Sequence, residues 1–63
     1  MNVGSRIRFY RRLRDVSQRE LALRLRMAAS QLSRYERGYT QPRLSVLARI
    51  ARALGVPVSD FFF

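Results

Sequence analysis

Apolar residues recur along this chain at the spacing of helices that turn one face to a core, and no useful stretch alternates with a period of two. The strong breakers of regular structure are Gly4, Gly38, Pro42, Gly55 and Pro57. Between them the pattern predicts helices over about Ser5–Arg14, from Ser17 onward, over about Ala29–Arg37, over about Leu44–Leu54, and a last short one from residues 57–60. The pattern is that of an all-α chain with five helices.

The start of the second helix carries the clearest local signal. Ser17 followed by Glu20 forms a capping box, in which each side chain accepts a hydrogen bond from the other residue's backbone N–H. Val16 and Leu21 stand at the spacing of a hydrophobic staple around this cap. Asp15 is a plausible exit from the first helix, because Asp tolerates left-handed backbone.

The third and fourth helices differ in how clearly their ends are marked. Ala28 precedes the third helix, where Ser or Thr would cap better. Gly55 is typical of the residue that ends a helix such as the fourth. The fourth helix carries an apolar stripe that we expect to face a core: Leu44, Leu47, Ile50, Ala51 and Leu54.

Length and composition exclude several classes of protein. The 63 residues allow one domain, residues 1–63, and contain neither Cys nor His. Disulfides, thiolate metal sites and the commonest general base are therefore excluded, and no paired carboxylates or phosphate-binding loop support catalysis. Apolar runs are far shorter than the roughly 20 residues that span a bilayer, and the N-terminus lacks a secretory h-region. We expect a cytoplasmic binding module with no enzymatic activity, metal or cofactor.

The charge balance indicates what such a module binds. All 13 basic residues are Arg, against four acidic ones, which leaves a net charge of +9. The planar guanidinium matches phosphate and the guanine edge, so the balance favours nucleic acid. The alternative is a merely solvated basic surface, or a codon bias toward Arg.

The predicted third helix has one free face. At about 100° per residue, Leu32 and Tyr35 define its buried side. The opposite side is small, hydroxylated and basic, which suits a DNA major groove, although an ordinary solvated face would have the same spacing. The residues on that side are Ser30, Ser33, Arg34 and Arg37, with Ala29 at its flank.

The ordered motifs resemble one known family. Residues 17–22 (SQRELA), 32–38 (LSRYERG) and 47–56 (LARIARALGV), with Met27 and Pro42 between them, are similar to the phage-repressor (Cro/CI, XRE-type) helix-turn-helix domain. The likeness runs from Arg6 to about Phe62. It implies a compact, five-helix, lambda-repressor-like domain, in which the second and third helices form the helix-turn-helix.

The resemblance also implies roles for particular residues. Arg11 and Glu36 match a partly buried structural ion pair between the first and third helices. The positions that read base edges in the family are Ala29, Ser30, Ser33 and Arg34 here. The positions that hold DNA phosphates are Ser17, Gln18, Arg37 and Arg43.

The chain departs from the family pattern at two places. Arg26 stands where the family usually has Gly in the turn, so a positive φ there would cost about 1 kcal/mol or more. Ala28 and Ala29 are smaller than the polar residues often found at these positions, which leaves base reading to Ser30, Arg34 and contacts with thymine methyl groups.

The aromatic C-terminal residues predict self-association. We expect Phe61 inside the core, whereas Phe62 and Phe63 cannot both be buried in a continuing helix. An exposed pair, continuous with Phe9 and Leu13, would suit a homodimer that reads two half-sites. The alternative is a frayed end or a truncated chain.

The leading function is sequence-specific binding of a double-stranded DNA operator by a small transcriptional regulator, with repression favoured. A rival is an antitoxin-like protein-interaction module that covers an acidic partner with the same basic surface. A membrane-active helix bundle is disfavoured, because the Arg residues are spread around most helices rather than gathered opposite one broad apolar face.

Overall fold

The computed structural model describes residues 2–62 of the chain. This part contains four α-helices and one short 3₁₀ helix, joined by short connections. They are α1 (Val3–Leu13), α2 (Gln18–Leu25), α3 (Ala29–Arg37), α4 (Leu44–Leu54) and the 3₁₀ helix η1 (Val58–Phe62). These residues contain no strand, so the predicted all-α class is confirmed. The fifth predicted helix is present as a 3₁₀ turn.

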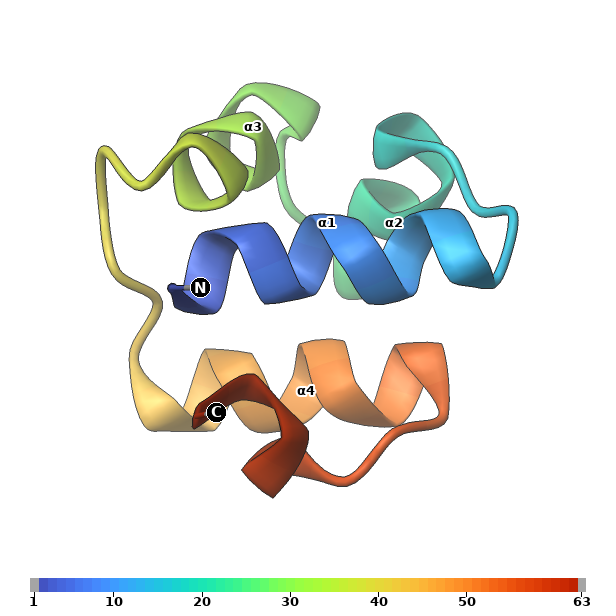
Figure 1. Ribbon diagram of the computed structural model, residues 1–63. Coiled ribbons are helices and arrows are strands. Elements are labelled where there is room, and N and C mark those ends of the chain that lie inside the picture. The colour runs from blue at the N-terminus through green and yellow to red at the C-terminus, as the bar shows by residue number, and fades with distance from the viewer. Residues whose placement is uncertain (1, 63) are drawn as a thin grey trace.

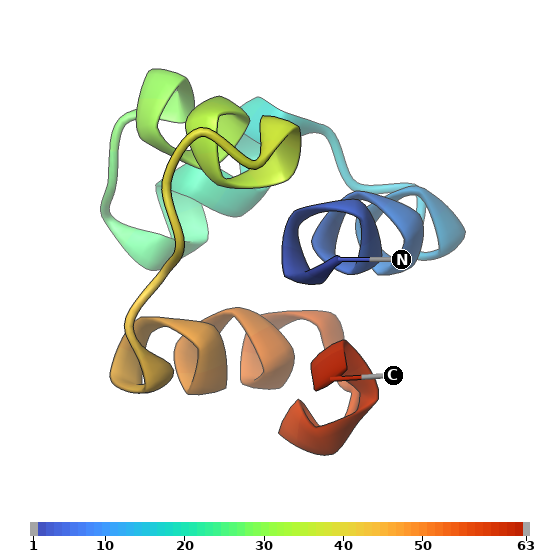
Figure 2. The ribbon, with the colours of Figure 1, turned by 60° about the vertical axis from the view of Figure 1, so that its left-hand side comes forward.

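In the view of Figure 1, α1 runs between α2 and α3 above and α4 below. It packs against α3 on one side and against η1 and α4 on the other, while α2 contacts both α3 and α4. Turned by 60°, the molecule shows α2 and α3 together at the top, α4 and η1 at the bottom, and α1 at one side (Figure 2). None of the helices in this described part is long and apolar enough to cross a membrane.

The first helix starts earlier than predicted, at Val3 rather than Ser5, and ends at Leu13. The Asn2 side chain caps it by accepting a hydrogen bond of 2.8 Å from the Ser5 backbone N–H. Gly4, which the sequence pattern treats as a breaker, lies buried inside the helix. A Cβ on this residue would lie 2.2 Å from the Tyr35 carbonyl oxygen, so the missing side chain lets α1 approach the α3 backbone.

The capping box at the start of α2 is confirmed. The Glu20 N–H donates to Ser17 Oγ over 3.0 Å, and the Ser17 N–H donates to Glu20 Oε1 over 3.2 Å. Asp15, with a φ of 58°, also adopts the left-handed backbone that its position predicts. The capping box and this turn together fix where the chain leaves α1 and enters α2.

The helix-turn-helix turn contains a second non-glycine residue in left-handed backbone. Arg26 ends α2 with a φ of 56°. The β-carbon of an L-residue crowds the backbone in this region, at a cost of roughly 1–2 kcal/mol. The turn thus keeps the positive φ that Gly usually provides in this family, and the Arg26 backbone is strained, as expected.

Two arginine side chains cap helix ends from a distance, which the sequence pattern did not predict. Arg14 Nε donates 2.9 Å to the Leu54 carbonyl oxygen at the end of α4. Arg49 Nη2 donates to the Leu25 carbonyl oxygen at the end of α2. These carbonyls belong to the last turn of each helix, where intrahelical donors are missing and a cation is favoured by the helix dipole.

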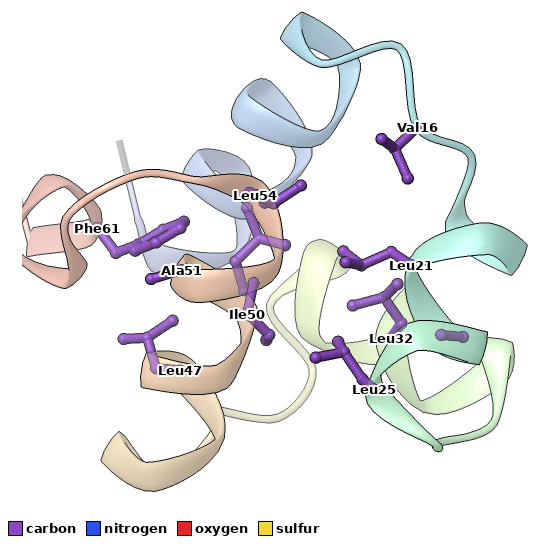
Figure 3. Close-up of a cluster of buried hydrophobic side chains, with 11 residues drawn as sticks. Val16, Leu21, Leu25, Leu32, Leu47, Ile50, Ala51, Leu54 and Phe61 are labelled. Carbon is purple, nitrogen blue, oxygen red and sulfur yellow. The ribbon is translucent and has the colours of Figure 1, made fainter.

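The core joins all five elements (Figure 3). Ile50, on α4, is one of its members and has no exposed surface. The predicted apolar stripe of α4 is confirmed except at Leu44, which is exposed because it begins the helix beyond the edge of the core. The core residues are Ile7, Val16, Leu21, Ala22, Leu25, Leu32, Leu47, Ile50, Ala51, Leu54 and Phe61.

The C-terminal element closes the core with one phenylalanine. Phe61 is buried, as predicted, and its ring meets Tyr10 edge to face with centroids 5.7 Å apart. The 3₁₀ geometry follows from a short turn after Pro57, whose carbonyl accepts from the Asp60 N–H over 3.0 Å. Phe62 is exposed, as predicted, while Phe63 lies outside the described residues.

Candidate nucleic-acid interface

The outer face of α3 is open to solvent. Ala29, Ser30, Arg34 and Arg37 are exposed, and Ser33 is half-buried. The helix is held from behind by Leu32, which is fully buried. The structure therefore presents the predicted base-reading residues on one surface, with Ser33 at its inner edge.

The beginning of α3 is slim and lacks a side-chain cap. Ala28 is the N-cap residue and makes no side-chain hydrogen bond to the helix, as its type predicts. The first backbone N–H groups of the helix have no partner within the helix, and they give this end a partial positive charge. The first residues at this end, Ala28, Ala29 and Ser30, are all small and exposed, so another molecule can approach closely.

Arg34 is paired with an aromatic ring that the sequence pattern did not single out. Its guanidinium carbon lies 6.0 Å from the ring centroid of Tyr39, an exposed residue in the connection after α3. The chain reverses at Gly38, whose φ is 80°, and this reversal brings the ring back beside the helix. The guanidinium and the ring form an exposed cation–π contact, worth about 0.5–1 kcal/mol. The sequence feature that could have indicated this contact is an aromatic residue, Tyr39, directly after Gly38, which ends the helix.

The Glu36 carboxylate connects three helices. Arg11 Nε donates to Glu36 Oε2 over 2.7 Å, and Arg11 Nη2 donates to Oε1 over 3.0 Å, which makes a two-point ion pair between α1 and α3. The Glu36 side chain is 1% exposed. Arg11 Nη1 also donates to the Val16 carbonyl oxygen over 2.8 Å, so the same guanidinium holds the α1–α2 connection.

Gln18 brings the start of α2 into this cluster. Its Nε2 donates to Glu36 Oε1 over 3.1 Å, which leaves the second amide hydrogen and the amide oxygen for other partners. Ser17, the preceding residue, accepts the Glu20 N–H and retains its own hydroxyl hydrogen. The beginning of α2 therefore keeps spare donors while its position relative to α3 is fixed by Glu36.

Further arginines surround this surface. Arg8 Nε lies 3.8 Å from Glu36 Oε1 with about half of its side chain exposed, and the motif comparison did not identify it. Arg37 is exposed at the end of α3. Arg43 is exposed and is the N-cap residue of α4. The Glu36 cluster therefore gathers Arg8, Arg11 and Gln18.

A family model described as helix-turn-helix matches residues 7–61 of this chain. An HTH-type transcriptional regulator of Sinorhizobium medicae (strain WSM419) is 40% identical over 62 residues, which are 98% of this chain and 45% of that protein. The immunity repressor protein of Bacillus phage phi105 is 41% identical over 59 residues, covering 94% of this chain and 41% of the repressor. The chain thus spans less than half the length of these curated relatives.

Two solved structures are similar over almost the whole chain. The clp gene regulator ClgR from Corynebacterium glutamicum superposes with a TM-score of 0.92 at 35% identity, over 95% of this chain and 64% of the regulator. SinR, the master regulator for biofilm formation, was solved in complex with DNA. It superposes with a TM-score of 0.89 at 32% identity, over 97% of this chain and 98% of that one.

Proposed function

Because this chain belongs to the helix-turn-helix family, in its phage-repressor type, we propose that it is a sequence-specific, double-stranded DNA-binding domain of a transcriptional repressor. The observation that carries the proposal is the open, small and basic face of α3, joined to the start of α2 through Glu36. In this proposal α3 enters the major groove, α2 lies against the backbone, and the protein acts on DNA in the cytoplasm.

The proposed base readers are Ala29, Ser30, Ser33 and Arg34. Arg34 offers two parallel donors, which match the O6 and N7 acceptors of guanine. Ser30 can donate to or accept from a base edge, and the Ala29 methyl suits contact with a thymine methyl. The small residues at the start of α3 support this assignment, because they let the helix backbone approach the bases.

The proposed phosphate contacts are Ser17, Gln18, Arg37 and Arg43. Gln18 supports the assignment most directly, since Glu36 holds one of its amide hydrogens and leaves the other free. The start of α2 adds backbone amides and a partial positive charge, which favour an anion. Arg43 is exposed before α4, so its guanidinium is available for a further contact with the DNA backbone.

The proposed active form is a homodimer, because one short helix reads too few base pairs to select a site. Phe62 supports a self-association surface around η1. It lines a hollow of about 450 Å³ together with Val3, Pro42, Leu44 and Leu47. Phe9 and Leu13 line another hollow, on α1.

The proposal is tested by selection from a randomised duplex pool at about 0.15 M salt, where binding through phosphates alone is weak. The expected result is an enriched palindrome whose half-site spacing matches a two-fold dimer. Enrichment of a single half-site would retain DNA recognition and exclude the dimer. Binding recovered only at low salt, with no enriched sequence, would exclude specific recognition and favour an antitoxin-like module.

Two variants distinguish base reading from phosphate binding. Arg34→Ala is expected to lose about 1–3 kcal/mol of discrimination at one base position, because the two-point contact with guanine is removed. Gln18→Ala is expected to weaken binding to all sequences about equally, because phosphates carry no sequence information. Both are measured by titrating the selected duplex and its single-base variants. An unchanged preferred sequence in Arg34→Ala would remove Arg34 from the base readers.

A further inference from the structure

The outer face of α1 carries an apolar hollow that the proposed DNA interface does not use. It has a volume of about 460 Å³ and is lined by Ser5, Arg8, Phe9, Arg12 and Leu13. Phe9 is 50% exposed and Leu13 is 61% exposed, so two large apolar side chains one helical turn apart meet solvent here. We call this feature the α1 hollow.

The Phe9 ring in the α1 hollow is held in place from beneath. It packs edge to face on Tyr10, with ring centroids 5.1 Å apart. Tyr10 in turn packs on the buried Phe61 ring, and its hydroxyl lies 3.4 Å from Asp60 Oδ2. A row of three aromatic rings therefore connects this surface to the core, which makes Phe9 a preformed contact rather than a freely moving side chain.

The α1 hollow faces a different direction from the proposed base readers. Gly4 and Arg11 turn toward α3, and Phe9 lies on the far side of α1 from them at about 100° per residue. In Figure 2, α1 forms one side of the molecule while α2 and α3 form its top. A partner in the hollow would therefore leave the outer face of α3 free.

The rim of the α1 hollow is basic. Arg8 and Arg12 flank the apolar residues, and no carboxylate lines the hollow. The chain's few acids are mostly engaged elsewhere: Glu36 holds Arg11, Glu20 caps α2 and Asp60 meets Tyr10. Arg8 Nε lies 3.8 Å from Glu36 Oε1 with about half of its side chain exposed. Arg12 shares a surface with Asp15 and Glu20 but forms no ion pair among the described residues. Both guanidinium groups can therefore still pair with carboxylates of an occupant.

Charge decides between three kinds of occupant. A second copy in a two-fold dimer would bring two identical basic rims together, and each copy carries +9. A DNA backbone would satisfy the arginines and leave Phe9 and Leu13 in contact with water and phosphate. A protein segment with both carboxylates and apolar side chains satisfies both requirements at once.

We propose that the α1 hollow binds an acidic amphipathic segment of a partner protein. Apolar side chains of that segment cover Phe9 and Leu13, and its carboxylates pair with Arg8 and Arg12. This surface includes none of the proposed base-reading or phosphate-binding residues, so the protein would hold DNA and its partner together.

The probe is a synthetic helical peptide of about 15 residues, with Leu along one face and Glu at most other positions. The peptide is titrated to about 1 mM against the ¹⁵N-labelled protein. Amide shifts are expected to concentrate in residues 5–13. The double variant Phe9→Ser/Leu13→Ser and the single variant Arg12→Glu are each expected to lower affinity by about tenfold or more. Leu23→Ser, which changes an exposed residue on α2, is the matched control and should bind as the parent does.

A second peptide with Gln in place of Glu tests the charge requirement and should bind at least about tenfold more weakly. Equal binding of both peptides would overturn the proposal. So would the absence of shifts in residues 5–13, or shifts centred on α3. Self-association without peptide that is abolished by Phe9→Ser/Leu13→Ser would assign the hollow to a second copy instead.

Discussion

Replacing Glu36 with alanine is expected to remove about 3–5 kcal/mol of stability, the largest effect of any single polar change in this chain. The variant leaves Arg11 buried without its two-point carboxylate partner, and it releases Gln18 from the same oxygen. A domain of 63 residues has a total stability of roughly 3–9 kcal/mol. The change is therefore expected to remove about a third or more of that stability, and all of it at the lower end of the range.

The Glu36→Ala change is measured by urea unfolding followed by circular dichroism at 222 nm, a wavelength that reports helix content. Glu20→Ala is the matched acidic control: its carboxylate makes only the exposed local bond of the capping box, so it should cost about 1 kcal/mol. A loss below about 1 kcal/mol in Glu36→Ala would mean that the ion pair contributes little. The combined Arg11→Met/Glu36→Leu variant is expected to regain much of the stability, since no buried charge is left unpaired.

Gly4→Ala is expected to destabilise the domain by about 3 kcal/mol, although the same change in an open helix is usually stabilising. The new methyl would stand 2.2 Å from the Tyr35 carbonyl oxygen and 2.9 Å from that of Glu36. Both oxygen atoms belong to the backbone of α3, so the clash cannot be relieved by rotating a side chain of α3. The helices α1 and α3 must therefore separate, and the Arg11–Glu36 pair lengthens with them.

Thermal unfolding monitors the Gly4→Ala change, with Gly55→Ala as control. A Cβ at Gly55 meets nothing within 4 Å, so only the strain of a φ of 71° remains, at about 1–2 kcal/mol. A midpoint for Gly4→Ala at or above that of the parent would show that α1 tolerates the displacement. A loss well beyond the Gly55→Ala value supports close approach as the reason for Gly4.

Local signals in the sequence predicted the local features of the fold. The Ser17–Glu20 capping box and the Gly55 helix end depend on a few adjacent residues, so a pattern suffices to find them. The buried start of α1 was missed for the opposite reason. Gly4 is required by the backbone of α3, which is more than 30 residues away in the chain, and a lone Gly near an end is normally a breaker.

In the candidate site, too, the sequence predicted some features and missed others. The periodicity of α3 placed Ser30 and Arg34 on its free face, and the resemblance to a family suggested that Arg11 pairs with Glu36. Nothing local marks the approach of Gln18 to Glu36, or of Tyr39 to Arg34. Each of these contacts depends on how two elements cross or how a loop turns back, which sequence periodicity does not encode.

The long-range arginine contacts give the composition of this chain a meaning beyond charge. Arg11, Arg14 and Arg49 each reach across to another segment and use a flat group with several donors. A lysine at each position would preserve the net charge of +9 and any attraction for phosphate. Its single ammonium could not join a carboxylate and a carbonyl at fixed angles, as Arg11 does. In this chain, which contains no cysteine, arginine side chains connect distant segments by hydrogen bonds and also supply the positive charge. Lysine could therefore not replace arginine at these positions without loss.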